Sequence, residues 1–247
     1  MRISIVIPVL NSHEILRRQL LHFENMGLPD GIEIIIVDDG SDPPLANTST
    51  LPIIFLQTND TRPWTWALAR NAGARIATGK YLLMTDIDHI IDKSLINDAL
   101  TDDGYQKISF SRQLGILDED GVFSQDIDTL VSYGADRKTI EKGLRIGPLP
   151  NNFCMRKDVF WDMGGYDETL VERPYPQGED RNFKKKWHQR VRSGKGSWGE
   201  KHPIIYMFPN GKYCGDVDYN PFGLFHNLSR KTRRNGWYRE QLRKCET

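Results

Sequence analysis

The sequence predicts an α/β protein whose core is a doubly wound, mostly parallel sheet flanked by helices. Two observations lead to this prediction. Continuous apolar runs rich in β-branched residues, such as Ile3–Val9 and Ile32–Val37, are typical of strands that are buried on both faces. Segments with the apolar spacing of helices separate these runs, and alternating strands and helices build parallel sheets that are covered on both sides.

The first half of the chain shows this alternation clearly. Asn11 or Ser12 can cap the start of the first helix, and Gly27 can end it. The strands expected in this half are Ile3–Val9, Ile32–Val37, Pro52–Leu56 and Tyr81–Thr85, and the helices are Ser12–Met26 and Trp64–Ala77.

The second half is less regular, and residues 124–148 are polar without a clear period. A turn at 118–121 separates the first two strands expected there. The strands expected in this half are Ile108–Arg112, Gly121–Phe123, Phe153–Met155 and Pro203–Met207, and the helices are Lys157–Met163 and Glu179–Arg192.

Charge is balanced overall but not along the chain. The 247 residues include 33 Lys and Arg and 33 Asp and Glu, which argues against a general nucleic-acid binder. Residues 181–247, however, hold 16 basic and 5 acidic side chains. This basic C-terminal quarter predicts a polyanionic substrate or surface near that end of the chain.

The cysteines and the hydropathy of the sequence indicate the cellular compartment to expect. The three cysteines, Cys154, Cys214 and Cys245, are widely spaced and form neither a disulfide framework nor a zinc pattern. No apolar stretch approaches the roughly 20 residues that span a bilayer. We therefore expect a soluble, cytoplasmic protein.

Asp86 and Asp88 come directly after the strand Tyr81–Thr85. Open α/β sheets bind ligands at the carboxyl ends of their strands. On an extended backbone, residues at i and i+2 point to the same side, and two close carboxylates repel each other unless a cation lies between them. Oxygen ligands suit Mg²⁺ or Mn²⁺. The pair predicts a divalent metal site, with a solvated acidic turn as the alternative.

Two further polar groups fall near the same edge. Asp38 and Asp39 follow the strand Ile32–Val37 and can accept a hydrogen bond from a base or a ribose, or simply form a turn. Arg70 lies in the helix Trp64–Ala77 and can bind phosphate through two N–H groups, or form a surface salt bridge.

Glu179 and Asp180 open the helix Glu179–Arg192. Carboxylates on a first helical turn are favoured by the helix dipole, so capping explains them. A general base that removes a proton from an acceptor hydroxyl is the functional alternative. Gly164 and Gly165, upstream, allow a close backbone approach to a sugar or form an ordinary helix stop.

A carboxylate pair needs another ligand to orient an ion, and phosphate oxygens, water or a histidine can supply it. His226 stands out because it lies in the apolar patch Phe222–Leu228 within a polar tail. The histidines considered as a third metal ligand are His89, His188, His202 and His226.

Five segments, in this order, resemble glycosyltransferase family 2 and its GT-A fold: SIVIPVLN, IIIVDDGS, ALARNAGARIATGKYLLMTDID, NNFCMRKDVFWDMGGYDE and GED. The resemblance covers roughly residues 1–192. It implies a single GT-A catalytic domain over residues 1–205, with a nucleotide-binding half (1–105) and an acceptor half (106–205). A basic C-terminal extension, 206–247, follows.

The resemblance also implies roles for the residues near the donor nucleotide. Asp39, with Asp38, would contact the base, and Arg70 would lie near the ribose or diphosphate. Asp88, and less directly Asp86, would hold Mn²⁺ or Mg²⁺ on the diphosphate. His226, which lies outside the resemblance, is expected as a further ligand from its place in the apolar patch alone. The nucleotide-binding residues expected are Pro8, Val9, Asn11, Asp38, Asp39, Arg70 and Asp86.

Catalytic and sugar-binding residues follow in the same way. Glu179 and Asp180 match the acidic pair of the family, and Asp180 is expected to be the base. The residues expected near the donor sugar or acceptor are Gly164, Gly165, Asp167 and Trp187.

The implied activity is metal-dependent transfer of a sugar from a nucleoside diphosphate sugar to an acceptor hydroxyl. A UDP-sugar is the donor expected. Direct displacement with one base inverts the anomeric carbon, so we expect an inverting enzyme. Single addition is expected because Lys184–Gln189 stands where processive relatives have an Arg or Gln-x-x-Arg-Trp-type element, and because no membrane helix is expected. The alternatives are a retaining transferase, a transferase acting on nucleic acid, and a non-catalytic sugar-nucleotide-binding protein.

The acceptor is left open by the sequence. The stretch Arg230–Arg239 is basic and contains Trp237 and Tyr238, a composition that suits phosphate backbones or anionic headgroups. An anionic acceptor, whether glycan, nucleic acid or lipid-linked, would fit it. A solvated helix packed on the body is the alternative.

Overall fold

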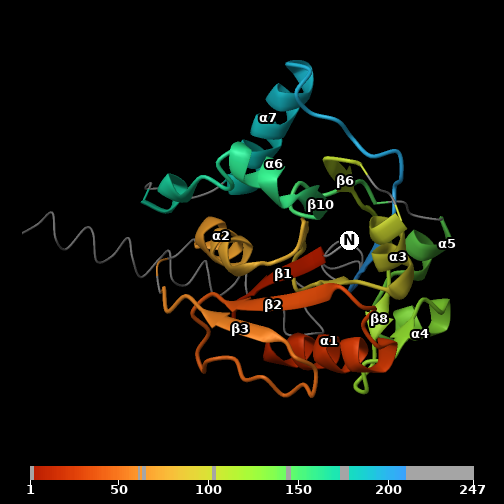
Figure 1. Ribbon diagram of the computed structural model, residues 1–247. Coiled ribbons are helices and arrows are strands. Elements are labelled where there is room, and N and C mark those ends of the chain that lie inside the picture. The colour runs from red at the N-terminus through yellow and green to blue at the C-terminus, as the bar shows by residue number, and fades with distance from the viewer. Residues whose placement is uncertain are drawn as a thin grey trace, which may run out of the picture.

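A six-stranded sheet organises the chain in the computed structural model (Figure 1), which describes residues 3–60, 62, 65–101, 104–142, 146–172 and 178–209. The strand order is β3-β2-β1-β4-β10-β6. The neighbouring strands from β3 to β4 pair in parallel, whereas β10 is antiparallel to β4 and β6. The strands are β1 (Ile3–Val9), β2 (Ile32–Asp38), β3 (Ile54–Gln57), β4 (Tyr81–Met84), β6 (Lys107–Ser109) and β10 (Phe153–Arg156).

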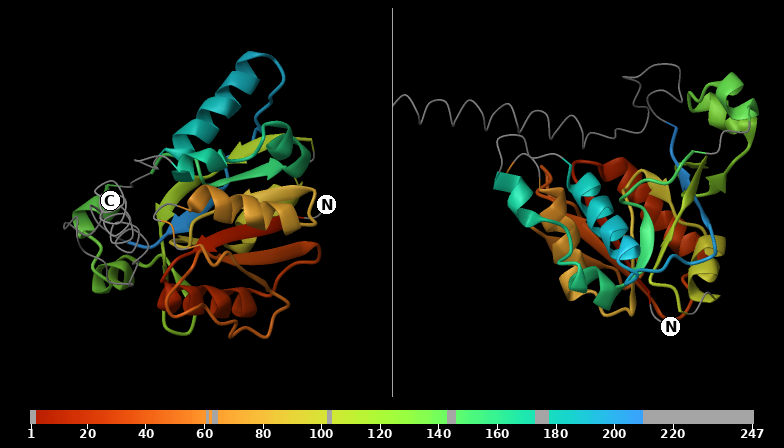
Figure 2. Two further views of the ribbon diagram at one scale, coloured as in Figure 1. Left: turned by 90° about the vertical axis from the view of Figure 1, so that its left-hand side faces the viewer. Right: turned by 90° about the horizontal axis from the view of Figure 1, so that it is seen from above.

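Helices cover both faces of this sheet, as Figures 1 and 2 show. Alternate residues of β1 point to opposite faces, so Ile5 and Ile7 join the apolar cluster that includes α1, while Val6 joins the cluster that includes α2. The helices on the Val6 face are α2 (Trp66–Ile76), α6 (Lys157–Asp162) and α7 (Glu179–Arg192), and the cluster on the other face includes α1 (His13–Met26) and α3 (Lys93–Thr101).

Two smaller sheets lie beside the central one. A three-stranded sheet has the order β5-β11-β7, with β11 (Ile204–Met207) between β5 (His89–Ile90) and β7 (Ser111–Leu114). β8 (Ile116–Leu117) and β9 (Phe123–Ser124) form an antiparallel pair. The short helices α4 (Ile127–Ser132), α5 (Arg137–Glu141) and η1 (Glu168–Glu172) complete the described elements. None of the helices in the described ranges is both long and apolar enough to cross a bilayer.

The predicted fold class is confirmed, and most predicted elements begin and end within two residues of the observed ones. The predicted strand Ile108–Arg112 is wrong, because the chain changes sheets at the fully buried Phe110. β6 pairs with β10, whereas Ser111 at the start of β7 donates a hydrogen bond to the carbonyl of Pro203. The elements α3, α4, α5 and β5 were not predicted, because such short segments carry little periodicity.

The proposed division into residues 1–105, 106–205 and 206–247 stays a prediction. Strands from both sides of residue 105 pair within one sheet, since β10 hydrogen-bonds to β4. The basic tail from residue 210 onwards, including His226 and the stretch 230–239, lies outside the described residues.

We expect Gly73→Ala to destabilise the fold. A Cβ added at Gly73 would lie 2.5 Å from Cγ1 of Val6 and 3.0 Å from Cγ2 of Val37, because α2 lies directly on the sheet there. Helix propensity favours Ala by about 1 kcal/mol, but overpacking costs about 1–3 kcal/mol. Urea unfolding should therefore show a net loss of up to about 2 kcal/mol.

Gly147→Ala is the matched control, because nothing lies within 4 Å of its added Cβ. Its free energy of unfolding should change by no more than about 0.5 kcal/mol. A stability gain in Gly73→Ala would contradict the tight contact between α2 and the sheet.

Candidate active site

The rim of the candidate site lies where β1 and β2 end. Pro8 and Val9 are the last residues of β1, both buried, and the strand register places them opposite Val37 and Asp38. The N–H group of Asp39 donates to the carbonyl of Val9 at 2.8 Å. The predicted nucleotide-binding residues of these two strands therefore lie side by side at one edge of the sheet.

Hydrogen bonds hold the loops beyond this edge. Asn11, at φ 51°, donates its N–H to Oγ of Ser41 at 2.9 Å, and its Oδ1 accepts from the N–H of Asp42 at 2.8 Å. The two carboxylate oxygens of Asp38 accept from the N–H groups of Ser41 and Leu45 at 2.8 and 2.9 Å. Both oxygens of Asp38 thus hold the loop that follows β2. Asp39, next to it, is fully buried.

Arg70 is completely buried in α2 and forms an ion pair with Asp86 in the loop after β4. Its guanidinium lies over the rings of Trp66 and Tyr166, at 4.8 and 5.6 Å from their centroids. Burial, the largest single cause, would lower the pKa of Arg70, but the charge and hydrogen bond of Asp86, together with Tyr166 and Glu179, outweigh it and the pKa is raised. The surface salt bridge considered for Arg70 is therefore excluded. Arg70 instead pairs with the loop that carries Asp86, Asp88 and His89, which we call the metal-site loop.

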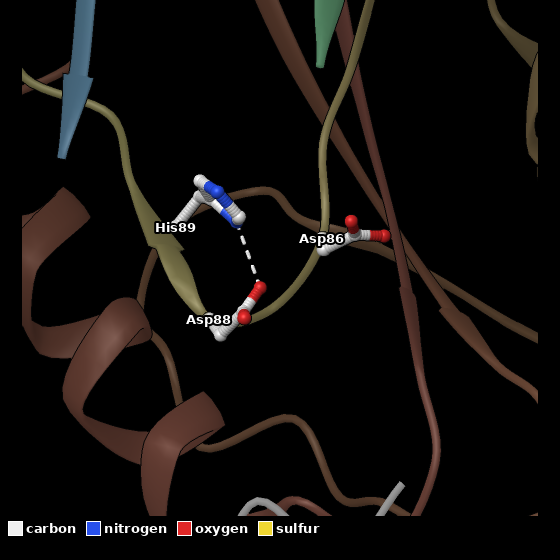
Figure 3. Close-up of side chains that lie close together, drawn as sticks. All are labelled: Asp86, Asp88 and His89. Atoms are coloured by element: carbon white, nitrogen blue, oxygen red, sulfur yellow. Dashed lines mark hydrogen bonds and ion pairs between the residues drawn. The ribbon is translucent and has the colours of Figure 1, made fainter. Parts of the chain in front are cut away.

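The loop that carries Asp86 and Asp88 is a turn (Figure 3), so the extended backbone assumed for this pair is wrong. The N–H of His89 donates to the carbonyl of Asp86 at 3.1 Å and closes the turn. Asp86 consequently faces Arg70, while Oδ1 of Asp88 accepts from Nδ1 of His89 at 2.7 Å. Figure 3 shows Asp88 turned toward His89 and Asp86 turned away from them.

The residues of this loop nevertheless fit a divalent cation. Asp86, Asp88 and His89 each offer one ligand atom, and these atoms lie within 4.8 Å of one another. Nδ1 of His89 lies 2.7 Å from Oδ1 of Asp88, and its buried Nε2 has no hydrogen-bond partner among the described residues. Carboxylate oxygens with an imidazole nitrogen form a donor set suited to Mn²⁺.

The histidines considered as a third ligand separate in the structure. His89 lies in the metal-site loop. His188 and His202 line a different cavity, beside α7. His226 lies outside the described residues, so its role as a ligand stays a prediction.

The acidic pair begins α7. Glu179 is buried and Asp180 is half-buried, with Oδ1 accepting from the N–H of Arg181 at 2.7 Å. Burial raises the pKa of Tyr166, Arg70 opposes this rise, and the charges of Asp86, Glu179 and Asp180 add to it. The structure therefore brings the acidic pair and the Arg70–Asp86 pair around one buried tyrosine.

The turn at 164–167 packs on α2. Gly165 has φ 57°, and an added Cβ would lie 2.8 Å from Oδ1 of Asn71, so this position requires glycine. Asn71 accepts from the N–H of Tyr166 at 3.0 Å and donates to its carbonyl at 2.9 Å. Asp167 accepts from the N–H and the hydroxyl of Thr169. The contacts of Gly165 thus explain it structurally, and the proposed sugar contacts of Gly164, Gly165 and Asp167 stay predictions.

Sequence reasoning missed several residues that hold the site together. Nε2 of Gln19 donates to the carbonyls of Ile87 and His89 at 3.2 and 2.8 Å, which ties α1 to the metal-site loop. The hydroxyl of Thr85 donates to Oδ1 of Asn152 at 3.3 Å. The position of a polar Gln19 on the apolar face of a helix could have indicated the contacts of Gln19. The sequence contains no pattern that indicates the contact between Thr85 and Asn152.

The fold and the site together are those of an α/β protein with a ligand site at the carboxyl ends of its strands, where a carboxylate pair and a buried arginine meet. The family model described as Glycosyl transferase family 2 matches residues 4–207. The chain belongs to glycosyltransferase family 2.

Solved structures agree with this assignment. The S. aureus TarS 1–349 structure has a TM-score of 0.52 and 16% identity, covering 85% of this chain and 61% of that one. The mannosyltransferase PcManGT from Pyrobaculum calidifontis, in complex with GDP-Man and Mn²⁺, has a TM-score of 0.51 and 13% identity, with 84% and 57% covered. At these identities the likeness shows the GT-A fold alone. The chain spans less than two thirds of either structure's length, and no curated protein sequence matches it.

We expect Arg70→Met to destabilise the protein strongly. The substitution leaves the buried carboxylate of Asp86 without its partner, and removing one member of a buried ion pair costs about 3–5 kcal/mol. Urea unfolding followed by tryptophan fluorescence measures the loss.

Arg137→Met is the control, because Arg137 pairs with Asp128 at an exposed position where both side chains meet solvent. It should cost less than about 1 kcal/mol. An equally small loss in Arg70→Met would show that the Arg70–Asp86 pair does not hold the site.

Proposed function

We propose that this chain transfers a sugar from a nucleoside diphosphate sugar to a hydroxyl group of an acceptor. The observation that supports it best is that Arg70 pairs with Asp86 while the charges of Asp86, Glu179 and Asp180 all act on the buried Tyr166. Sugar transfer from such a donor needs cationic groups for the leaving diphosphate and a carboxylate for the acceptor. This edge supplies both kinds of group.

The donor side consists of the metal-site loop and the rim of β1 and β2. Asp86, Asp88 and His89 would hold the divalent ion, and such an ion neutralises charge on the diphosphate as it leaves. Arg70 orients Asp86 through their ion pair. Pro8, Val9, Asn11 and Asp39 would line the nucleotide, while Asp38 shapes the loop that carries them.

The acceptor side consists of the start of α7. We assign Asp180 as the base rather than Glu179, because Asp180 is half-buried and can meet an acceptor that enters from solvent, whereas Glu179 is 6% exposed. A single base opposite the leaving group implies direct displacement and hence inversion of the anomeric carbon.

The donor and the number of sugars added are narrower proposals. We propose a UDP-sugar donor and a single addition, in line with the resemblance of the sequence. The neighbouring P. calidifontis enzyme is described with GDP-Man, so GDP-sugars belong in the same donor panel.

We expect Asp88→Ala to abolish both hydrolysis of the donor and sugar transfer, because the metal-site loop loses an oxygen ligand. The measurement is release of nucleoside diphosphate from a panel of UDP- and GDP-sugars with and without Mn²⁺ or Mg²⁺. Asp128→Ala is the matched control, since this exposed aspartate pairs only with Arg137 among the described residues and should keep full activity. Undiminished metal-dependent hydrolysis in Asp88→Ala would remove that residue from the ion.

We expect Asp180→Asn to reduce transfer by about 10²- to 10⁴-fold, the usual contribution of a general base, while donor affinity stays unchanged. Transfer is measured with saturating donor, and donor affinity by calorimetry. Glu179→Gln is the control and should retain transfer.

Full transfer in Asp180→Asn would assign the base elsewhere. The anomeric configuration of the product, determined by NMR, provides an independent outcome. Retained configuration would overturn the inverting mechanism while leaving sugar transfer intact.

A further inference from the structure

A cavity of about 550 Å³ lies beside α7 and takes its walls from four segments of the chain. These are β6, the residues 148–150, the middle of α7 and the residues 198–202. The N–H of Gly199 donates to the carbonyl of Lys107 at 2.9 Å, so the last segment is joined to the free edge of β6. The lining residues that matter here are Lys107, Lys184, Trp187, His188, Trp198 and His202.

Lys107 is the unusual group in this cavity, because its side chain is almost completely buried, with 3% of the residue exposed. Its ammonium lies 4.3 Å from the ring centroid of Phe153, 5.4 Å from that of Trp187 and 5.5 Å from that of Trp198. Across the described part of the chain, no carboxylate pairs with it. Burial, assisted by the charge of Lys184, lowers the pKa of Lys107 to about 7.

A buried ammonium without an anionic partner is costly, and ring faces recover only part of that cost. None of the other polar lining side chains supplies a negative charge, since Lys184 is a second cation and the rest are Ser109, His188 and His202. The described lining residues include no acid. The indole N–H of Trp187 is also buried without an acceptor among the described residues. The ammonium of Lys107 thus lacks a carboxylate partner at the cavity, and an anion in the cavity would supply one.

The aromatic walls suit a sugar ring. Trp187 and Trp198 meet edge to face with their centroids 5.2 Å apart, and Trp198 is 43% exposed. Aromatic faces of this kind provide apolar area with a polar edge, and pockets that bind polar ligands combine such area with a few placed polar groups. A tryptophan pair beside a buried cation therefore fits an acidic carbohydrate.

The cavity shares two elements with the candidate active site. α7 carries the acidic pair on its first turn and Lys184, Trp187 and His188 further along. The segment 148–150 continues into Asn151 and Asn152, which accept from the hydroxyls of Tyr166 and Thr85. The lining residue Lys184 follows Asp180 by about one helical turn, so the cavity and the acidic pair lie on neighbouring turns of α7.

We propose that this cavity binds the acceptor, and that the acceptor is a glycan with an anionic group, carboxylate or phosphate, which pairs with Lys107 while a sugar ring packs on the exposed Trp198, whose ring is held by the buried Trp187. The identification of the ligand as an acceptor rests on the proposed function. The anionic carbohydrate site itself rests on the unpaired ammonium and the tryptophan pair.

The test is calorimetric titration of the intact protein with glucuronate, glucose 6-phosphate and uncharged glucose. We expect the anionic sugars to bind more tightly than glucose, and the tighter of the two identifies the acidic group. Lys107→Met should weaken anionic binding by about 10- to 100-fold, the loss expected for a charged hydrogen bond, and leave glucose unaffected. Lys80→Met is the matched control and should bind as the wild type, because Lys80 lies over the Tyr81 ring but is exposed.

Equal binding of glucose and the anionic sugars, or unchanged anionic binding in Lys107→Met, would overturn the proposal. Should Lys107→Met fail to fold, Trp198→Ala tests the proposal instead. Loss of this aromatic ring should weaken glucuronate binding. Unchanged glucuronate binding would overturn the site.

Donor hydrolysis in the same preparations separates this proposal from the proposed function. Lys107→Met should hydrolyse the nucleotide sugar at the wild-type rate, since Lys107 is not part of the donor side. A wild-type protein that hydrolyses no nucleotide sugar contradicts the proposed function. Normal hydrolysis without binding of anionic sugars contradicts the cavity proposal alone.

Discussion

The buried ion pair between Arg70 and Asp86 is the interaction on which the candidate site depends. A guanidinium that is fully enclosed between Trp66 and Tyr166 needs a compensating charge, because burial of an unpaired cation is strongly unfavourable. Asp86 supplies this charge and so places the loop after β4 against α2. The metal-site loop, which follows β4, is therefore positioned by α2, the helix that precedes β4 in the chain.

The same helix also positions the acidic pair. Asn71, next to Arg70, binds the backbone of Tyr166 through both ends of its amide. The ring of Tyr166 in turn stacks on Phe183 of α7, with centroids 4.5 Å apart. One turn of α2 thus contacts the loop after β4 through Arg70 and, by way of Tyr166, the helix that begins with the acidic pair.

Two of the buried cations among the described residues, Arg70 and Lys107, contrast in a way that indicates different roles. Arg70 has a carboxylate partner, and its pKa is raised accordingly. Lys107 has aromatic rings and a neighbouring lysine instead, and its pKa is lowered to about 7. A cation with an internal partner organises structure, whereas a cation that faces a cavity without one is suited to an external anion. This contrast is the physical basis for assigning the acceptor to the cavity beside α7.

The sequence by itself determined the fold class, the main strands and the edge where the site lies, because continuous apolar runs and the carboxylates that follow them are local patterns. It also contained the family, through five ordered segments. Only the tertiary structure decided how the polar side chains pair. Asp86 faces Arg70 because the backbone turns after β4, Asp38 binds loop amides, and Lys107 lies among rings from β10, α7 and residue 198. These partners are far apart in the chain, and their pairing depends on packing that no local spacing encodes.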